Sequence, residues 1–319
     1  MRKRQDPFKP VSKGLSVTGT PRQLQLLDLF TRYECLPTTY IHKAIGEQYA
    51  KDLITLLNTE GYIRIPVAST KRMDARNKEA MWEGTPKGEK LLGKTFRKEG
   101  DHFQHKAHRT VAWFLFDHAA RALGLERRTI TDIVLDERCP LATRAEQRPS
   151  TFDIDGYTVI PDEELSGFRL TLPNGKHRSF YFFLEADGGT ETRVPGTEKA
   201  HKKKSTQTMI EMYAAFFARE MYQSRYGLKN IIVFIIVKDW TDALSIMRVI
   251  GTVAPKHKRR FAFKVIPDFT EGFPKPDETI LTEDWHTLEG PLNILNILKG
   301  GDANGRSETG PNSAVEKAA

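Results

Sequence analysis

The fold of this chain is decided by residues 179–187, SFYFFLEAD, which run directly into GGTE at 188–191. Aromatic and apolar side chains fill 180–184, a pattern typical of a strand buried on both faces of a sheet. Glu185 and Asp187 follow at once, and the alternation of side chains along a strand would place both on the same face. Carboxylates that directly continue a buried strand indicate a functional site at the end of that strand.

Helices and strands alternate on both sides of this segment. We predict helices over about 102–123, 204–222 and 243–253, and strands over 129–135, 157–160, 230–237 and 261–266. Asn174-Gly175 is a hairpin-turn signal between the strand at 157–160 and the strand at 179–184. This order predicts an α/β (α+β) fold, in which a mixed sheet carries helices on its faces.

The first third of the chain has a different pattern. Thr-Pro pairs at 20–21 and 85–86 are helix starts, and two further helices are predicted near 38–46 and 48–59. Residues 62–67 and 79–83 then form a hairpin with a basic tip. This order predicts a winged helix-turn-helix whose third helix enters the major groove of double-stranded DNA. The residues expected to contact phosphates are Lys51 on that helix and Lys71, Arg72 and Arg76 on the wing. The alternative is a small helical cap that packs on the larger body.

Charge is distributed unevenly along the 319 residues. Residues 1–110 hold 21 Lys and Arg against 12 Asp and Glu, whereas the whole chain has 49 and 41. The excess of positive charge therefore lies in the first third, which indicates a module that meets a polyanion such as nucleic acid. A solubilising surface is the competing interpretation of the charge alone.

The length of the chain suggests two domains, or one large domain with an appendage. We expect a basic arm over 1–17, the winged helix over 18–98, an α/β domain over 102–299 and a disordered tail over 300–319. No apolar run approaches the roughly 20 residues of a membrane-spanning helix. The two cysteines are too few and too far apart for a disulfide scaffold. We therefore expect a cytoplasmic protein with no membrane partner.

We expect a third carboxylate, that of Asp162, near Glu185 and Asp187. Asp162 follows Pro161 at the end of the predicted strand 157–160, and hairpin pairing through Asn174-Gly175 can bring it near Glu185. Carboxylates that converge repel one another unless a divalent cation or a shared proton compensates them. Mg²⁺ or Mn²⁺ held there can activate water and neutralise charge on a phosphate during strand scission. The alternative is solvated loop acids, which is our expectation for Glu163, Glu164 and Glu191.

Together, Pro161-Asp162 and the strand ending Glu185-Ala186-Asp187 resemble the PD-(D/E)XK, or restriction-endonuclease-like, fold. Over about residues 18–240 the chain more narrowly resembles the replication-relaxation family, which includes the MobC-type mobilisation relaxases. The features that carry this resemblance are TPRQLQLLDLF and LLNTEGYIR in the first domain, TPKGEKLL after it, a His-led helix at His108, and E-x-D-x-G-T-E from Glu185 to Glu191.

This resemblance implies a metal-dependent DNA-nicking protein of a plasmid or other mobile element. Asp162 and Glu185 would be the metal ligands, and the double-stranded DNA would contain an origin of transfer or replication. The third site position, a Lys in most nucleases of this fold, is Asp187 here, and Lys203 is the residue we expect to replace it. Without such a replacement, the chain would be a non-catalytic DNA-binding replication or regulatory factor. A third possibility is an accessory protein that works with partner proteins of a mobilisation or replication complex.

Overall fold

The computed structural model describes residues 10–67, 79–96, 103–187, 205–267 and 272–301. Four predicted site residues lie outside these ranges: Lys71, Arg72, Arg76 and Lys203. Most of the expected arm over 1–17 and tail over 300–319 is outside them as well. The chain divides into two compact units, Met1–Leu115 with Ile266–Asp277, and Phe116–Val265 with Glu278–Ala319.

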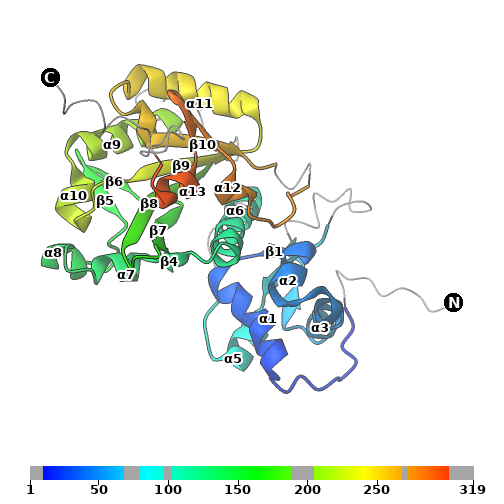
Figure 1. Cartoon of the computed structure of the whole chain (residues 1–319). Coiled ribbons are helices and arrows are strands. Elements are labelled where there is room, and N and C mark those ends of the chain that lie inside the picture. Colours follow the sequence, from blue (N-terminus) through cyan, green and yellow to red (C-terminus); the bar gives the residue numbers. More distant parts are fainter. Residues whose placement is uncertain (1–9, 68–78, 97–102, 188–204, 268–271, 302–319) are drawn as a thin grey trace, which may run out of the picture. The chain divides into compact units, whose positions relative to one another are not determined.

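Unit 1 is built of short helices and a three-stranded sheet (Figure 1). Its elements are α1 (Pro21–Arg32), β1 (Leu36–Pro37), α2 (Thr38–Ile45), α3 (Glu47–Thr59), β2 (Ile63–Arg64), β3 (Met81–Gly84), α5 (Pro86–Leu92) and the first part of α6 (Phe103–Ala122). The strands are antiparallel in the order β1-β3-β2. The predicted helices and hairpin are confirmed, whereas β1 was not predicted.

Local capping explains why these helices begin and end where they do. Thr20 forms a capping box with Gln23 at the start of α1, and the Thr85 side chain caps α5 through the Gly88 N–H. Gly46 separates α2 from α3 with φ +92°, a conformation that an L side chain adopts only with strain. The backbone conformation of Gly46 therefore ends α2 and allows α3 to begin at the next residue.

Unit 1 also includes a segment far beyond residue 98, Ile266–Asp277. The Tyr40 hydroxyl donates to the Pro274 carbonyl at 2.7 Å, and His108 Nε2 lies 2.7 Å from the Ile266 carbonyl oxygen. Phe273 packs against a small core cluster made of Cys35, Met81, Phe103 and Ala107. The segment Ile266–Asp277 thus completes the core of this unit.

Unit 2 has a seven-stranded sheet in the order β12-β11-β10-β9-β8-β7-β4. The strands are β4 (Glu126–Arg128), β7 (Glu163–Thr171), β8 (His177–Asp187), β9 (Ile232–Val237), β10 (Phe261–Val265), β11 (Trp285–Thr287) and β12 (Gly290–Leu292). β8, β9 and β10 run parallel, and all other neighbours are antiparallel. The predicted mixed α/β architecture is confirmed at this level.

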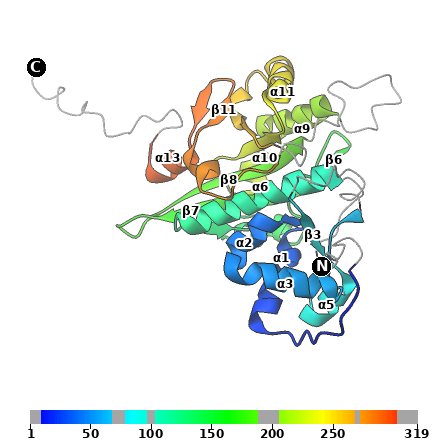
Figure 2. The same ribbon diagram turned by 90° about the vertical axis from the view of Figure 1, so that its right-hand side faces the viewer.

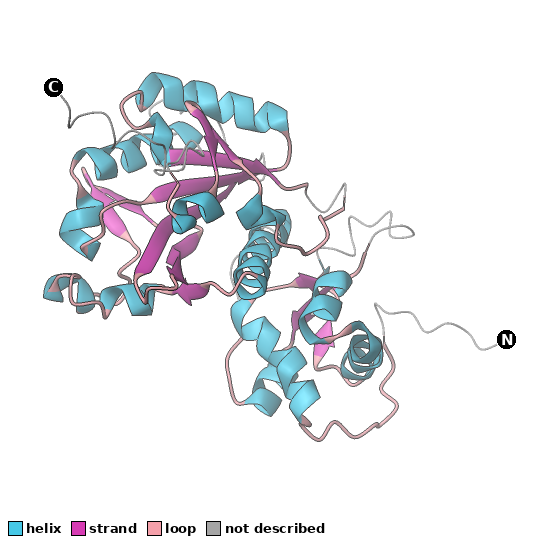
Figure 3. Ribbon diagram, in the orientation of Figure 1, coloured by secondary structure: helices cyan, strands magenta, loops and turns pink. Residues whose placement is uncertain are grey.

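Helices cover both faces of this sheet (Figure 3). On one face, α9 (Thr206–Ala218), α10 (Met221–Tyr226) and α11 (Trp240–Val253) pack on a large apolar core that includes Phe183 and Val233. On the other face, Phe116 of α6 stacks on Phe168, Phe182 and Phe234, and α13 (Ile294–Lys299) lies along β8. The remaining described elements of unit 2 are α7 (Ile130–Val134), α8 (Leu141–Arg144), β5 (Phe152–Ile154), β6 (Tyr157–Val159), the 3-10 helix η2 (Lys258–Arg260) and α12 (Thr279–Thr282).

One predicted strand of the sheet is wrong, and another is a strand that lies outside the main sheet. Within 129–135, residues Ile130–Val134 form helix α7, because Thr129 and Asp132 make a capping box that outweighs the β-branched composition. The strand at 157–160 is β6, which pairs only with β5 in a separate two-stranded sheet. The hairpin partner of β8 is β7, a strand that was not predicted. This hairpin can be followed in Figure 2.

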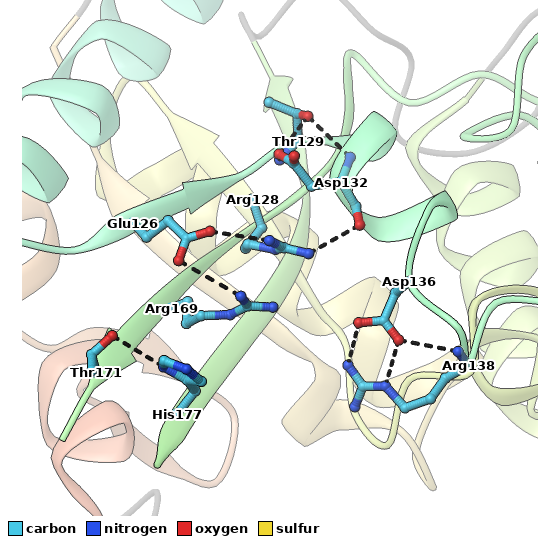
Figure 4. Close-up of polar contacts among 9 residues, drawn as sticks. All are labelled: Glu126, Arg128, Thr129, Asp132, Asp136, Arg138, Arg169, Thr171 and His177. Atoms are coloured by element: carbon cyan, nitrogen blue, oxygen red, sulfur yellow. Dashed lines mark hydrogen bonds and ion pairs between the residues drawn. The ribbon is translucent and has the colours of Figure 1, made fainter. Parts of the chain in front are cut away.

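Charged side chains line the β4 edge of the sheet (Figure 4). Glu126 pairs with Arg128 at 3.0 Å and with Arg169 at 3.7 Å, and Arg138 makes two hydrogen bonds to Asp136. Arg128 also donates to the Asp132 carbonyl at 3.0 Å. Charged residues on an edge strand disfavour pairing with another chain. Because Glu126 pairs with two arginines and Asp136 with a third, this network stabilises the edge.

Within the described ranges, no helix combines the length and the hydropathy that a bilayer crossing requires.

Candidate functional site

The start of β7 and the end of β8 lie side by side. Their register pairs Glu163 with Leu184, so that Asp162 falls opposite Glu185. The Asp162 carboxylate accepts a hydrogen bond from the Ala186 backbone N–H at 2.8 Å. The expectation that Asp162 comes near Glu185 is therefore confirmed, although Asp162 precedes a strand of the sheet instead of ending one.

The acidic end of β8 is buried. Glu185 is 2% exposed and Asp187 is 6% exposed, so neither is a solvated loop acid. Alternation places both on the face of Phe183, whose ring packs against Tyr213 and Phe216 of α9. These two carboxylates thus point to the sheet face that α9 covers.

A tyrosine of α9 also contacts the acidic end of β8. Tyr213 is fully buried, and its hydroxyl donates a hydrogen bond of 2.5 Å to Glu185 Oε1. Burial, followed by the negative charges of Glu185 and Asp162, raises the pKa of Tyr213 well above its usual value. Both carboxylates therefore lie near this hydroxyl. The available signal was its place on the inward face of α9, two turns from the start of the helix.

The described residues contain no cluster of three or more His, Cys, Asp or Glu side chains that could hold a metal ion. The expected convergence of three carboxylates is thus wrong for a three-ligand centre. The structure brings together the pair Asp162 and Glu185, with Asp187 on the same strand face. Two carboxylate ligands suit Mg²⁺ or Mn²⁺, because Mg²⁺ commonly takes one or two carboxylates and keeps several waters. The oxygen donors of this pair fit such an ion.

Other acidic and basic candidates have separate positions. Glu163 was interpreted as solvated but is 4% exposed, because the β7–β8 pairing puts it beside Leu184. Glu164 is exposed, as expected. Lys203 and Glu191 lie outside the described residues.

The candidate DNA-contacting face of unit 1 lies on α3. Lys51 is exposed, as are Gln48, Asp52 and Thr55, which follow the same side of the helix. At the start of α3, the guanidinium of Arg22 lies 3.5 Å from the ring centroid of Tyr49. This face carries both signs of charge together with neutral hydrogen-bonding groups. It can contact base edges as well as phosphates.

Neither a protein-family model nor a curated protein or solved structure matches this chain closely enough to count as similar. The functional interpretation therefore depends on the residues and geometry of the chain itself.

Proposed function

We propose that this protein binds double-stranded DNA through unit 1 and nicks one strand with Mg²⁺ or Mn²⁺ held by Asp162 and Glu185. The observation that carries the proposal is the approach of these carboxylates at the end of β8, where Asp162 accepts from the Ala186 N–H. Glu185 is buried and Asp162 is half-buried, and two acidic side chains this close together are costly unless a cation or hydrogen bonds compensate them. A divalent cation would supply that compensation.

The order of elements supports a nuclease of the PD-(D/E)XK type. When the short elements α7, α8, β5, β6 and α10 are left out, the order is α6, β4, β7, β8, α9, β9, which is the α-β-β-β-α-β order that this resemblance implies. The strands β4, β7, β8 and β9 are successive neighbours in the sheet. Asp162 precedes β7 and Glu185 lies near the end of β8, the positions at which the resemblance expects the acidic residues. These correspondences support the proposal independently of the charge of the first domain.

Each residue of the site has a distinct proposed role. The cation would activate water and neutralise charge that develops on the phosphodiester. Asp162 and Glu185 would bind it, and Asp187 would accept a hydrogen bond from a water on the same strand face. Lys203 would orient the attacking water in place of the strand lysine.

For DNA binding, the support is the order α1, β1, α2, α3, β2, β3 and the sheet order β1-β3-β2, which suit a winged helix. In that interpretation α3 enters the major groove with Lys51 exposed, and Lys71, Arg72 and Arg76 on the wing contact phosphates. The natural substrate would be an origin of transfer or replication on a plasmid or other mobile element. Cytoplasmic location and partner proteins of a mobilisation or replication complex belong to the same proposal.

A second candidate function is that of a non-catalytic DNA-binding replication or regulatory factor. Asp187 favours it, because this position has a carboxylate where most nucleases of the fold have a lysine. In that case the sheet would be a scaffold, and the Asp162 contact to Ala186 would serve stability alone.

A nicking assay on supercoiled plasmids that carry candidate origins separates the two functions. We expect the wild type to convert supercoiled into open-circular DNA with Mg²⁺ or Mn²⁺ and to be inactive in EDTA. Asp162→Asn and Glu185→Gln should lose at least about 100-fold in rate, as expected when a group that stabilises transition-state charge is removed. Wild-type DNA binding without nicking on any substrate would support the scaffold function instead.

A further inference from the structure

The ring of Tyr213 lies among aromatic side chains, and its hydroxyl faces the acidic end of β8. Its ring packs against Phe152, Phe183 and Phe261, with centroid separations of 5.8, 5.7 and 6.5 Å. The hydroxyl at the end of that ring donates to Glu185 Oε1. The ring is therefore fixed by packing, and the position of the hydroxyl is fixed with it.

Each member of the carboxylate pair has one oxygen held by a donor of the protein framework. The Ala186 N–H holds Asp162 Oδ2, and the Tyr213 hydroxyl holds Glu185 Oε1. Both donors are neutral, so they orient the carboxylates without cancelling their negative charge. A cation on the strand at position 187 would have reduced that charge, and the chain has Asp187 there.

We infer that Tyr213 is a positioning residue that holds Glu185 in the orientation required to bind the divalent cation. This inference rests on the proposed function, because it assumes that Asp162 and Glu185 bind the ion. Hydrogen bonds from neighbouring side chains fix the orientation of metal-binding carboxylates, and losing one typically lowers metal affinity or activity by about 10–100-fold. Tyr213 acts through Glu185 and needs no contact with DNA.

The chain offers a matched control for removing this hydroxyl. Tyr226 of α10 is also fully buried, and its hydroxyl donates to the Pro149 carbonyl at 2.8 Å. Tyr213→Phe and Tyr226→Phe each remove one oxygen from a buried ring. Only the first change removes a hydrogen bond to a proposed metal ligand.

The test measures Mn²⁺ binding to the full-length protein by electron paramagnetic resonance of the free ion. Nicking rates are measured in parallel as a function of Mn²⁺ concentration. We expect Tyr213→Phe to raise the Mn²⁺ dissociation constant and the half-saturating Mn²⁺ concentration by about tenfold. DNA affinity in EDTA should stay at the wild-type value. Tyr226→Phe should leave both metal measurements unchanged, even if its melting temperature falls.

The outcomes separate the two levels of the proposal. If wild type binds Mn²⁺ and nicks DNA while Tyr213→Phe matches Tyr226→Phe in both metal measurements, the positioning role is overturned and the proposed function stands. If wild type neither binds Mn²⁺ nor nicks, the proposed function fails and the inference fails with it. The inference is supported if the Mn²⁺ dissociation constant rises in Tyr213→Phe and stays at the wild-type value in Tyr226→Phe, whatever the effect of either substitution on the melting temperature.

Discussion

The carboxylate of Asp162 accepts a hydrogen bond from the backbone N–H of Ala186, the residue between the two acidic positions of β8. This contact joins the beginning of one strand to the end of its neighbour. Asp162 therefore has a structural role and, under the proposed function, a metal-binding role. Substitutions can separate the two.

We expect Asp162→Asn to retain most of the stability, because the amide oxygen can still accept from the Ala186 N–H. Asp162→Ala should be less stable by about 1–3 kcal/mol, because a buried N–H then loses its partner. Both should lose Mn²⁺ binding and nicking. Urea unfolding combined with the nicking assay checks this. Full nicking by Asp162→Asn would remove this residue from the set of metal ligands.

A pair of glycines gives substitutions with opposite expected effects on stability. A Cβ at Gly167 would lie 2.6 Å from the Phe180 carbonyl oxygen and 2.6 Å from Tyr181 Cδ1. Gly167→Ala should therefore destabilise by about 1–3 kcal/mol through overpacking. At Gly251 in α11 the nearest atom is Leu288 Cδ2 at 3.7 Å, so Gly251→Ala should stabilise the helix by about 0.5–1 kcal/mol.

Urea unfolding of both variants under the same conditions tests the packing of the β7–β8 hairpin. Equal effects of the same sign at the two positions would contradict the close approach of β7 to the Tyr181 ring.

Much of the secondary structure could be predicted because its signals are local. The Thr20-Pro21 and Thr85-Pro86 pairs located α1 and α5, and the apolar run of β9 needed no tertiary information. Strand β7 was missed because EELSGFRLT mixes charged, polar and apolar residues. Its polar residues include Arg169, which pairs with Glu126 of β4. Because this is a tertiary contact, the local sequence of β7 does not indicate it.

The sequence was enough to predict which acidic residues form the candidate site, but it only partly predicted how they are arranged. Burial and alternation identified Glu185 and Asp187 from the sequence. The place of Asp162 depends on a hairpin of β7 with β8 and on an irregularity between Glu163 and Ser166 that shifts the register by one residue. Side-chain patterns do not reveal such a shift in advance. The Tyr213 hydroxyl was missed because helical periodicity shows that a ring faces inward but does not show what its polar atom meets.

Acid should weaken the β4 edge through Asp136. Hydrogen bonds from Arg138, with burial opposing them, hold the pKa of Asp136 below its ordinary value of 3.8. A depressed pKa in the folded state adds stability above about pH 4, and this contribution is lost as the pH falls through the folded pKa. Asp136→Asn should therefore be less stable than wild type at pH 6, by about 1 kcal/mol. The difference should shrink steadily below pH 4.

Urea unfolding from pH 2.5 to pH 6 measures this difference. In an Arg138→Met background, Asp136→Asn should change the free energy of unfolding by an amount that depends much less on pH, because the guanidinium that lowers the pKa of Asp136 is absent. If the difference in free energy of unfolding between Asp136→Asn and wild type is the same at every pH in this range, the ion pair between Asp136 and Arg138 is contradicted.

The proposed DNA contacts of unit 1 should be visible in the salt dependence of affinity. Each phosphate contact contributes about −0.9 to the slope of log K against log salt for duplex DNA. The triple variant Lys71→Ala/Arg72→Ala/Arg76→Ala should therefore reduce the steepness of the slope by about 2–3, and Lys51→Ala by about 1. Fluorescence anisotropy from 50 to 300 mM salt measures both. Lys176→Ala, at the β7–β8 turn of unit 2, removes one positive charge as Lys51→Ala does, and it should keep the wild-type slope. If the triple variant and this control have the same slope as wild type, the wing does not contact phosphates and the positive charge of the first third serves another purpose.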